Sequence, residues 1–321
     1  MNKILVIQTA FIGDVILATP ILEALHKGYP SAIIDILVRK GNQTLFGGHP
    51  FLRHVLVWDK SNGKYKNLLL LRIAIKRQKY DAVINCQRFA ASGFLTAFSG
   101  AKIKIGFDKN PFSGRFTHKV MHEISNGKHE CERNLALLAP LSISGEAKPK
   151  LYPKPLENLP SESFICMAPA SVWFTKQFPV HKWVELITFV GKDKLILLTG
   201  GPSDAALCNE IIEQLPDFNL KNVCGLYSLL QSAELMRHAE MNYVNDSAPM
   251  HLCSAVDAPV TAIYCSTIPE FGFGPLSKVS YVAQTQEKLE CRPCGLHGFK
   301  VCPEGHFNCA ETIHPQDIIH S

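Results

Sequence analysis

The stretch MNKILVIQTAFIGDVILATP, residues 1–20, decides the fold class. Residues 3–8 form an apolar run rich in Ile, Leu and Val, and over residues 14–27 Leu, Ile and Ala recur at helical spacing. A buried strand that leads directly into a helix is the first half of a βα unit in a parallel sheet. Asp14 stands where the apolar core of a signal peptide would continue, so we expect a cytoplasmic chain.

The same alternation of strand and helix patterns runs along the chain and restarts once. It predicts a helix at residues 68–78 and, in the first half, further strands at 32–38, 54–58, 81–86 and 102–106. In the second half it predicts strands at 163–168, 194–199, 222–224, 241–245 and 260–265. Each half therefore has the pattern of a Rossmann-like α/β domain.

A proline-rich segment separates the two series. Residues 144–160 contain Pro149, Pro153, Pro155 and Pro160, which sustain neither a helix nor a central strand. We therefore predict two Rossmann-like domains, residues 1–150 and 151–321, that face each other across a cleft. Ligands of such sheets bind outside the carboxyl ends of the strands, so the cleft is the expected active site.

Composition and charge narrow the class of protein. The 321 residues are 46% hydrophobic and 19% charged, which excludes a disordered or collagen-like chain. Every long apolar run is interrupted by polar residues, so we expect no membrane-spanning helix. Residues 1–150 carry 22 Lys and Arg against 10 Asp and Glu, and residues 151–321 carry 11 against 18. The basic half suits an anionic partner such as nucleic acid, anionic lipid or a phosphorylated glycolipid, unless it is only a soluble basic surface.

The first loop whose residues suit binding or catalysis is residues 8–14, at the end of the first predicted strand. Gly13 lets the backbone approach a ligand, and the Asp14 carboxylate stands in the first helical turn, where it can face the cleft. The alternative is that Asp14 only caps the helix. The loop lacks the G-x-G-x-x-G fingerprint, which counts against a nicotinamide-dependent oxidoreductase.

Two further loops follow predicted strands of the second half. Residues 168–179 hold Ser171 and Lys176, which suit a diphosphate, although an exposed loop lysine is the alternative. Residues 244–251 place a turn before a helix that begins near Pro249, and the backbone amides at Ser247 and Ala248 would face an anion there. Each loop alone is a weak signal, whereas three loops at strand ends together predict an anion-binding site.

In their order along the chain, these motifs resemble the bacterial lipopolysaccharide heptosyltransferases, glycosyltransferase family 9. The resemblance rests on Gly13-Asp14, Lys176-x-x-Pro179, Gly201-Pro202-Ser203-Asp204 and Asp246-Ser247-x-Pro249-Met250-His251. It implies a GT-B fold and an inverting transfer of heptose from an ADP-heptose-type donor to the lipopolysaccharide inner core, with no metal or other cofactor needed for catalysis. The implied partners are the nucleotide sugar and a phosphorylated glycolipid, with peripheral contact at the inner face of the inner membrane and no nucleic acid.

The resemblance also assigns roles to residues. It makes Asp14 the general base and Lys176 the catalytic residue that holds the leaving diphosphate. Asp204 matches a residue that binds the nucleotide ribose, and Tyr227 falls where the family packs a side chain against the base, with a core tyrosine as the alternative. The remaining implied donor-binding residues are Gly13, Ser171, Asp246, Ser247, Ala248, Met250 and His251.

The chain departs from the family pattern at three places. Ala170 and Ala248 replace usual glycines, and Cys265-Ser266-Thr267 replaces a glycine-led turn, so each adds a Cβ where backbone would approach phosphate. The alternatives are therefore a weakly active or inactive paralogue that acts as a binding protein, or a transferase that uses another nucleotide sugar.

Four cysteines near the C-terminus form a separate cluster in the sequence. Cys291 and Cys294 make a C-x-x-C pair, and Cys302 and Cys309 follow at wider spacing. Four thiolates can close a tetrahedral structural zinc site, which would leave no open position for water. Free thiols in a reducing compartment are the alternative.

Overall fold

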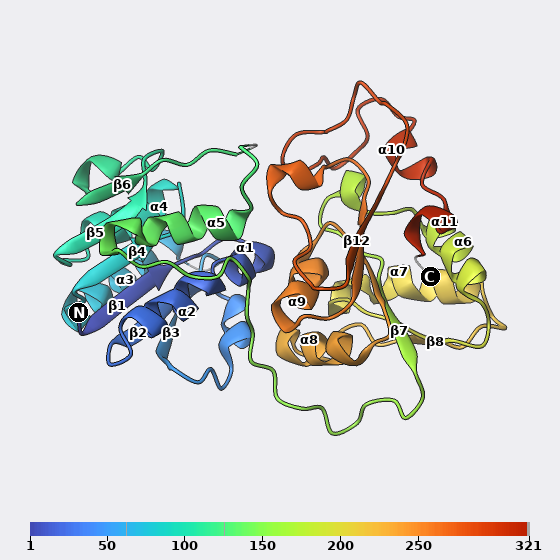
Figure 1. Ribbon diagram of the computed structural model, residues 1–321, viewed down its shortest axis with the longest axis horizontal. Coiled ribbons are helices and arrows are strands. Elements are labelled where there is room, and N and C mark those ends of the chain that lie inside the picture. Colours follow the sequence, from blue (N-terminus) through green and yellow to red (C-terminus); the bar gives the residue numbers. More distant parts are fainter. Residues whose placement is uncertain (62, 125, 320–321) are drawn as a thin grey trace. The chain divides into compact units, whose positions relative to one another are not determined.

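A computed structural model describes residues 1–61, 63–124 and 126–319 of the chain (Figure 1). The chain divides into two compact units, Met1–Tyr152 and Pro153–Ser321. The division falls inside the predicted proline-rich segment, within a longer stretch, residues 142–163, that has no helix or strand. In the part of the chain that is described, no helix is long and apolar enough to cross a membrane.

The N-terminal unit is built on a six-stranded sheet in which all paired strands are parallel. Its strand order is β3-β2-β1-β4-β5-β6, the Rossmann order. Successive strands are added on one side of β1 up to β3 and on the other side from β4 onward, so the strand order reverses between β1 and β4. The strands are β1 (Lys3–Ile7), β2 (Ile33–Arg39), β3 (Leu52–Trp58), β4 (Ala82–Asn85), β5 (Ile103–Phe107) and β6 (His118–Val120). The central strand β1 is buried from Ile4 to Ile7, which explains its unbroken apolar run.

Helices pack on this sheet in two groups, α2 with α5 and α3 with α4. The helices are α1 (Ile12–Leu17), α2 (Thr19–Gly28), α3 (Lys64–Gln78), α4 (Ala90–Ala97) and α5 (Glu130–Leu135). Short 3-10 turns are η1 (Asn42–Phe46), η2 (Ser113–Arg115) and η3 (Ala136–Leu141). One core cluster joins Leu5, Leu37 and Val83 of the sheet to Ile75 of α3 and Leu95 of α4.

The C-terminal unit repeats this plan with the strand order β12-β11-β10-β7-β8-β9, again all parallel. The point where the strand order switches, with β8 and β9 on one side and β11 and β12 on the other, lies between β7 and β10. The strands are β7 (Phe164–Ala168), β8 (Leu195–Leu198), β9 (Leu220–Asn222), β10 (Asn242–Asn245), β11 (Val260–Tyr264) and β12 (Ser280–Gln284). The two predicted Rossmann-like sheets are thus confirmed.

Helices of the C-terminal unit also form two groups, α8 with α9 and α6 with α7 and α11. They are α6 (Val180–Val190), α7 (Ala205–Glu213), α8 (Leu229–His238), α9 (Ala248–Val256), α10 (Asn308–Glu311) and α11 (Pro315–Ile318). The 3-10 turns are η4 (Phe174–Lys176), η5 (Pro202–Asp204) and η6 (Pro269–Phe271). The largest fully buried side chain, Trp183 of α6, packs edge-on against Phe178.

Local structure differs from the sequence prediction at a few elements. The single helix expected over residues 14–27 is interrupted at Ala18. Pro20 has no N–H to donate to the Ile16 carbonyl, and the Thr19 hydroxyl donates to that carbonyl instead at 2.7 Å. The strand predicted at residues 222–224 is Leu220–Asn222. The edge strands β6 and β12 were not predicted, since β6 has only three residues and most residues of both strands are partly or fully exposed.

Candidate active site

The clearest constellation lies where the C-terminal sheet reverses direction. Lys176, in η4 after β7, places its ammonium 2.6 Å from Oδ2 of Asp246, which follows β10. Both side chains are largely buried, with 15% and 7% of their surface exposed. Since β7 and β10 are neighbours, the fold brings together two residues that lie 70 positions apart in the sequence.

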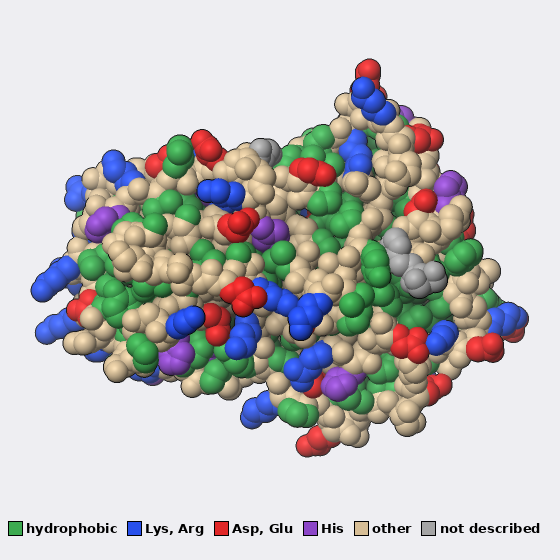
Figure 2. Space-filling view, viewed as in Figure 1, with side chains coloured by type: hydrophobic (Ala, Val, Ile, Leu, Met, Phe, Trp, Pro, Cys, Tyr) green, Lys and Arg blue, Asp and Glu red, His purple; other side chains and the backbone are tan. Residues whose placement is uncertain are grey.

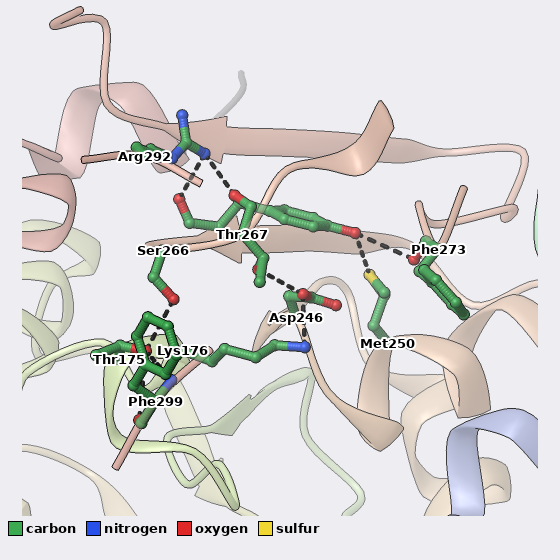
Figure 3. Close-up of polar contacts among 10 residues, drawn as sticks. Thr175, Lys176, Asp246, Met250, Ser266, Thr267, Phe273, Arg292 and Phe299 are labelled. Atoms are coloured by element: carbon green, nitrogen blue, oxygen red, sulfur yellow. Dashed lines mark hydrogen bonds and ion pairs between the residues drawn. The ribbon is translucent and has the colours of Figure 1, made fainter. Parts of the chain in front are cut away.

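The Asp246 carboxylate is held by the loop that follows β11 as well. Thr267 donates its hydroxyl to the same Oδ2 at 2.6 Å. Arg292 in turn fixes this loop, because its guanidinium donates to the backbone carbonyls of Cys265 at 2.8 Å, Tyr264 at 3.2 Å and Thr267 at 2.8 Å. Figure 3 shows Arg292 above Ser266 and Thr267, and Lys176 extending to Asp246 from below.

Asn245 fixes the loop that carries Ser171 and Lys176. Its side chain is fully buried, and its Oδ1 accepts the Phe178 amide at 2.9 Å while its Nδ2 donates to the Pro169 carbonyl at 2.8 Å. A buried side-chain amide of this kind is retained where its hydrogen bonds set a backbone path. The Ser171 amide donates to Gln177 Oε1 at 3.2 Å, which closes the loop on itself.

The turn into α9 has the features expected of an anion site. Ser247 is the N-cap and Ala248 the first residue of this nine-residue helix. The Ser247 hydroxyl is buried and has no hydrogen-bond partner among the described residues, so its hydrogen-bonding capacity is unused. His251 is buried one turn into the helix. Met250 is fully buried and its sulfur accepts the Tyr264 hydroxyl, so its side chain packs in the interior.

Two predicted nucleotide contacts lie on loops of the same unit. Asp204 ends η5, after β8, where its carboxylate accepts the Gly201 amide at 2.8 Å and the Ser203 hydroxyl at 3.2 Å. A Cβ at Gly200 would come within 2.8 Å of the Asp204 side chain, which explains a glycine there. Tyr227 is half-buried between β9 and α8. These roles toward a nucleotide stay predictions.

In the N-terminal unit, Asp14 lies at the corresponding reversal point, after β1. It follows Gly13 in the first turn of α1, is half-buried, and accepts the Phe11 amide at 3.2 Å. This is the contact expected if Asp14 caps the helix. Because a carboxylate has two oxygens with several lone pairs, capping and a catalytic role are compatible.

A buried ion pair that no sequence pattern indicated lies in α5, near Asp14. Glu130 Oε2 accepts from Arg133 Nε at 2.7 Å, and both side chains are more than nine-tenths buried. Burial raises the pKa of Glu130, the Asp14 charge raises it further, and Arg133 and Arg88 oppose the shift. The two carboxylates therefore influence each other. The only sequence signal was a Glu and an Arg three positions apart on one helix, which is common on helix surfaces.

The four cysteines predicted as a cluster line one cavity of about 210 Å³, together with Thr175 and Arg292. Burial raises the pKa of Cys309 to about 12, with the neighbouring Cys294 as a further cause. Within residues 1–61, 63–124 and 126–319, however, no three or more Cys, His, Asp or Glu side chains are grouped so that they could hold a metal ion. The zinc site stays a prediction.

Of the three departures from the family pattern, the turn at Cys265-Ser266-Thr267 has a structural explanation at two of its positions. Cys265 is fully buried, so its side chain adds no bulk to the loop surface. Thr267 supplies the hydroxyl that binds Asp246, a contact that glycine could not make. Nothing in the structure explains Ala248, whose methyl group lies at the start of α9, beside the candidate anion site.

Each of the two Rossmann-like sheets thus carries charged or polar side chains beside the two central strands where its strand order switches, which is where open α/β sheets bind their ligands. The family model for glycosyltransferase family 9 (heptosyltransferase) matches residues 69–297. The chain therefore belongs to glycosyltransferase family 9.

Similar proteins agree with this assignment. Lipopolysaccharide heptosyltransferase 3 of Escherichia coli is 24% identical over 277 residues, which cover 80% of this chain and 82% of that protein. The structure of a glycosyl transferase family 9 protein from Veillonella parvula matches with a TM-score of 0.84 at 22% identity, covering 99% of this chain and 95% of that chain. The E. coli ADP-heptose lps heptosyltransferase II matches with a TM-score of 0.80 at 21% identity, covering 98% and 96%. These likenesses confirm the predicted GT-B fold class.

Proposed function

We propose that this protein is an inverting, metal-independent glycosyltransferase that moves heptose from ADP-heptose to the phosphorylated inner core of lipopolysaccharide. Membership of the heptosyltransferase family supports the reaction class. The similarity to the E. coli ADP-heptose lps heptosyltransferase II supports the donor and the acceptor class. The observation that carries the proposal is the buried Lys176–Asp246 pair at the reversal point of the C-terminal sheet.

On the donor side, Lys176 would bind the diphosphate and stabilise the negative charge that grows as it departs. Asp246 keeps the ammonium in place before the donor binds. The N-terminus of α9 and the unpaired Ser247 hydroxyl supply further donors for phosphate oxygens. Ser171, on the loop fixed by Asn245, would donate to the same phosphates. Asp204 would accept from the ribose hydroxyls, and Tyr227 would pack on adenine.

On the acceptor side, Asp14 would act as the general base. It would take the proton of the acceptor hydroxyl while that oxygen attacks the anomeric carbon and the bond to the diphosphate breaks on the opposite face, which inverts the configuration. A single base and no covalent intermediate suffice for this reaction. The positive charge that the leaving group needs comes from Lys176 and the α9 terminus, so the proposed transfer uses no metal. We place the reaction in the cytoplasm, at the inner face of the inner membrane, with no nucleic acid partner.

Calorimetry of the purified chain against ADP, GDP, UDP, CDP and NADH tests the donor assignment. We expect selective binding of ADP that is lost in Lys176→Ala. At 100 times its dissociation constant, ADP should add about 2.7 kcal/mol to the free energy of unfolding, which a thermal-shift assay detects. Selective binding of GDP or UDP would keep a transferase and change its sugar nucleotide. No response from folded protein would favour the inactive paralogue, and a response to NADH alone would favour an oxidoreductase.

A further inference from the structure

Helix α3 (Lys64–Gln78) is apolar on two sides. Its inner side packs on the N-terminal sheet, where Ile75 is fully buried and Leu68 and Leu71 contact the core cluster around Trp58 and Leu95. This side accounts for the stability of the helix in the fold. The opposite side is unexplained by packing within the unit.

The outer side of α3 presents a row of large apolar side chains. Tyr65, Leu69 and Ile73 recur every four residues, so they lie along one side of the helix, and they are 75%, 54% and 40% exposed. Leu70, 54% exposed, widens the row. Single exposed leucines are ordinary on a protein surface, whereas a contiguous row on one helix marks an interaction site.

The charges on α3 are of one sign. The helix carries Lys64, Lys66, Arg72, Lys76 and Arg77, and it contains no Asp or Glu. Lys66, Lys76 and Arg77 are exposed beside the apolar row. The surrounding unit is basic as well, and on the face drawn in Figure 2 Lys and Arg side chains line its left-hand end. A partner for this surface must therefore combine negative charge with an apolar interior.

We propose that the outer face of α3, made of Tyr65, Leu69, Leu70 and Ile73 with Lys66 and Arg77, docks the protein on an anionic lipid bilayer. Bilayers offer both properties at once: the apolar row enters the boundary between headgroups and acyl chains, and the long basic side chains extend along it to anionic headgroups. A second copy of this chain fits less well, because α3 against α3 would bring ten cations together without a carboxylate from either helix.

The position of α3 in the unit gives the docking a consequence for the active site. The Trp58 indole donates to the Lys64 carbonyl at 3.5 Å, and Lys60 lies over the Trp58 ring with its ammonium 2.7 Å from the Thr9 carbonyl. Thr9 belongs to the loop that leads to Asp14. The start of α3 is thus connected to the candidate catalytic loop through two side chains, so a docked α3 would hold that loop near the membrane surface.

This inference takes from the proposed function only the expectation that the acceptor sits in a membrane. Docking itself requires no transfer, so the two ideas can fail separately. Vesicle flotation of the full chain is the test, with vesicles of phosphatidylcholine alone and vesicles that also contain about 30% phosphatidylglycerol, at about 0.1 M and 0.5 M salt. We expect binding to the anionic vesicles only, and strong weakening at the higher salt.

Two double variants separate the apolar and the charged parts. Leu69→Gln with Ile73→Gln keeps good helix formers at exposed positions and should lower vesicle binding at least about tenfold. Lys66→Gln with Arg77→Gln should lower it about 30-fold, since each cation near an anionic surface contributes about fivefold. Phe189→Gln on α6, 57% exposed, and the exposed Lys119→Gln on β6 are matched controls that should bind like the wild type.

Four results would overturn the proposal. The first is no binding of the wild type to anionic vesicles, and the second is unchanged binding in both double variants. The third is a dimer in sedimentation velocity that Leu69→Gln with Ile73→Gln dissociates, which would assign the face to a second copy. As a separate readout, that apolar variant should transfer normally to a delipidated, water-soluble acceptor. Loss of this activity would show that the face contacts the acceptor and not the bilayer.

Discussion

Lys176 and Thr267 both contact the same oxygen of Asp246, each at 2.6 Å. The loops after β7, β10 and β11 are therefore joined at one buried carboxylate. Because Arg292 anchors the last of these loops through three carbonyls, the position of the Lys176 ammonium depends on residues distant in the sequence. The candidate donor site is built before any donor binds, which is the arrangement that electrostatic catalysis requires.

Replacing Lys176 by Ala should weaken ADP binding about 10- to 100-fold and slow transfer, because a charge-assisted contact to the diphosphate is lost both before and during departure. Calorimetry and steady-state kinetics measure the two effects. Lys182→Ala on α6 is the matched control, since Lys182 is also largely buried and is paired with Glu185 at 3.1 Å. Unchanged kinetics in Lys176→Ala would remove this lysine from the site.

Thr267→Val should lower ADP affinity about three- to tenfold, because Asp246 loses one of the two groups that hold it while the shape of the side chain is kept. Thr267→Ser retains the hydroxyl and should bind ADP like the wild type. Titration calorimetry of both variants gives the comparison. Equal affinity of the Val and Ser variants would show that the hydrogen bond does not position the site.

His122 predicts a loss of stability in mild acid. Burial, helped by the charges of Arg88 and Arg133, lowers its pKa from 6.5 to about 4. The unfolded chain then takes up a proton near pH 6.5 while the folded chain does so only near pH 4, so the free energy of unfolding should fall as the pH drops through this window and should not change from this cause above it. Urea unfolding of the wild type and His122→Gln from pH 8 to about 4 measures it. The variant should show the smaller acid loss, and parallel curves would contradict the assignment.

The zinc hypothesis, which rests on the spacing of Cys291, Cys294, Cys302 and Cys309 in the sequence, predicts about one metal ion per chain in protein purified without added metal. Chelation should then lower the melting temperature, and Cys294→Ser should lose the metal. The Cys131→Ser variant, at a buried thiol of the N-terminal unit, should keep it. Less than about a tenth of an equivalent would reject the hypothesis and leave four free thiols.

The architecture of both sheets was predictable because strand and helix periods alternate so regularly, and parallel pairing then places loop ends side by side. For this reason the sequence could indicate both Lys176 and Asp246, although not their direct contact. The position of Met250 in the interior was not foreseen. Met250 packs against Tyr264, and its sulfur accepts a hydrogen bond from the Tyr264 hydroxyl.

The supporting residues could not be predicted, because their contacts depend on side-chain direction across long stretches of chain. Arg292 lies 25 residues from Thr267 in the sequence. It stands among the C-terminal cysteines, and no motif there connects it with the candidate donor site. Asn245 looks like the end of a strand, and Glu130 with Arg133 looks like an ordinary helix pair. The edge strands β6 and β12 were missed because β6 has only three residues and neither strand shows a run of buried apolar residues or a regular alternation of buried and exposed ones.

The most direct test of the proposed reaction compares wild type and Asp14→Asn in transfer of heptose from ADP-heptose to lipopolysaccharide acceptor. Asn keeps an oxygen that can accept the Phe11 amide, so the fold and ADP affinity should be unchanged. The turnover number should fall by roughly two to four orders of magnitude, as expected for the loss of a general base. Near-normal turnover in the variant, or loss of ADP binding together with a lowered melting temperature, would contradict the role of Asp14 as the base.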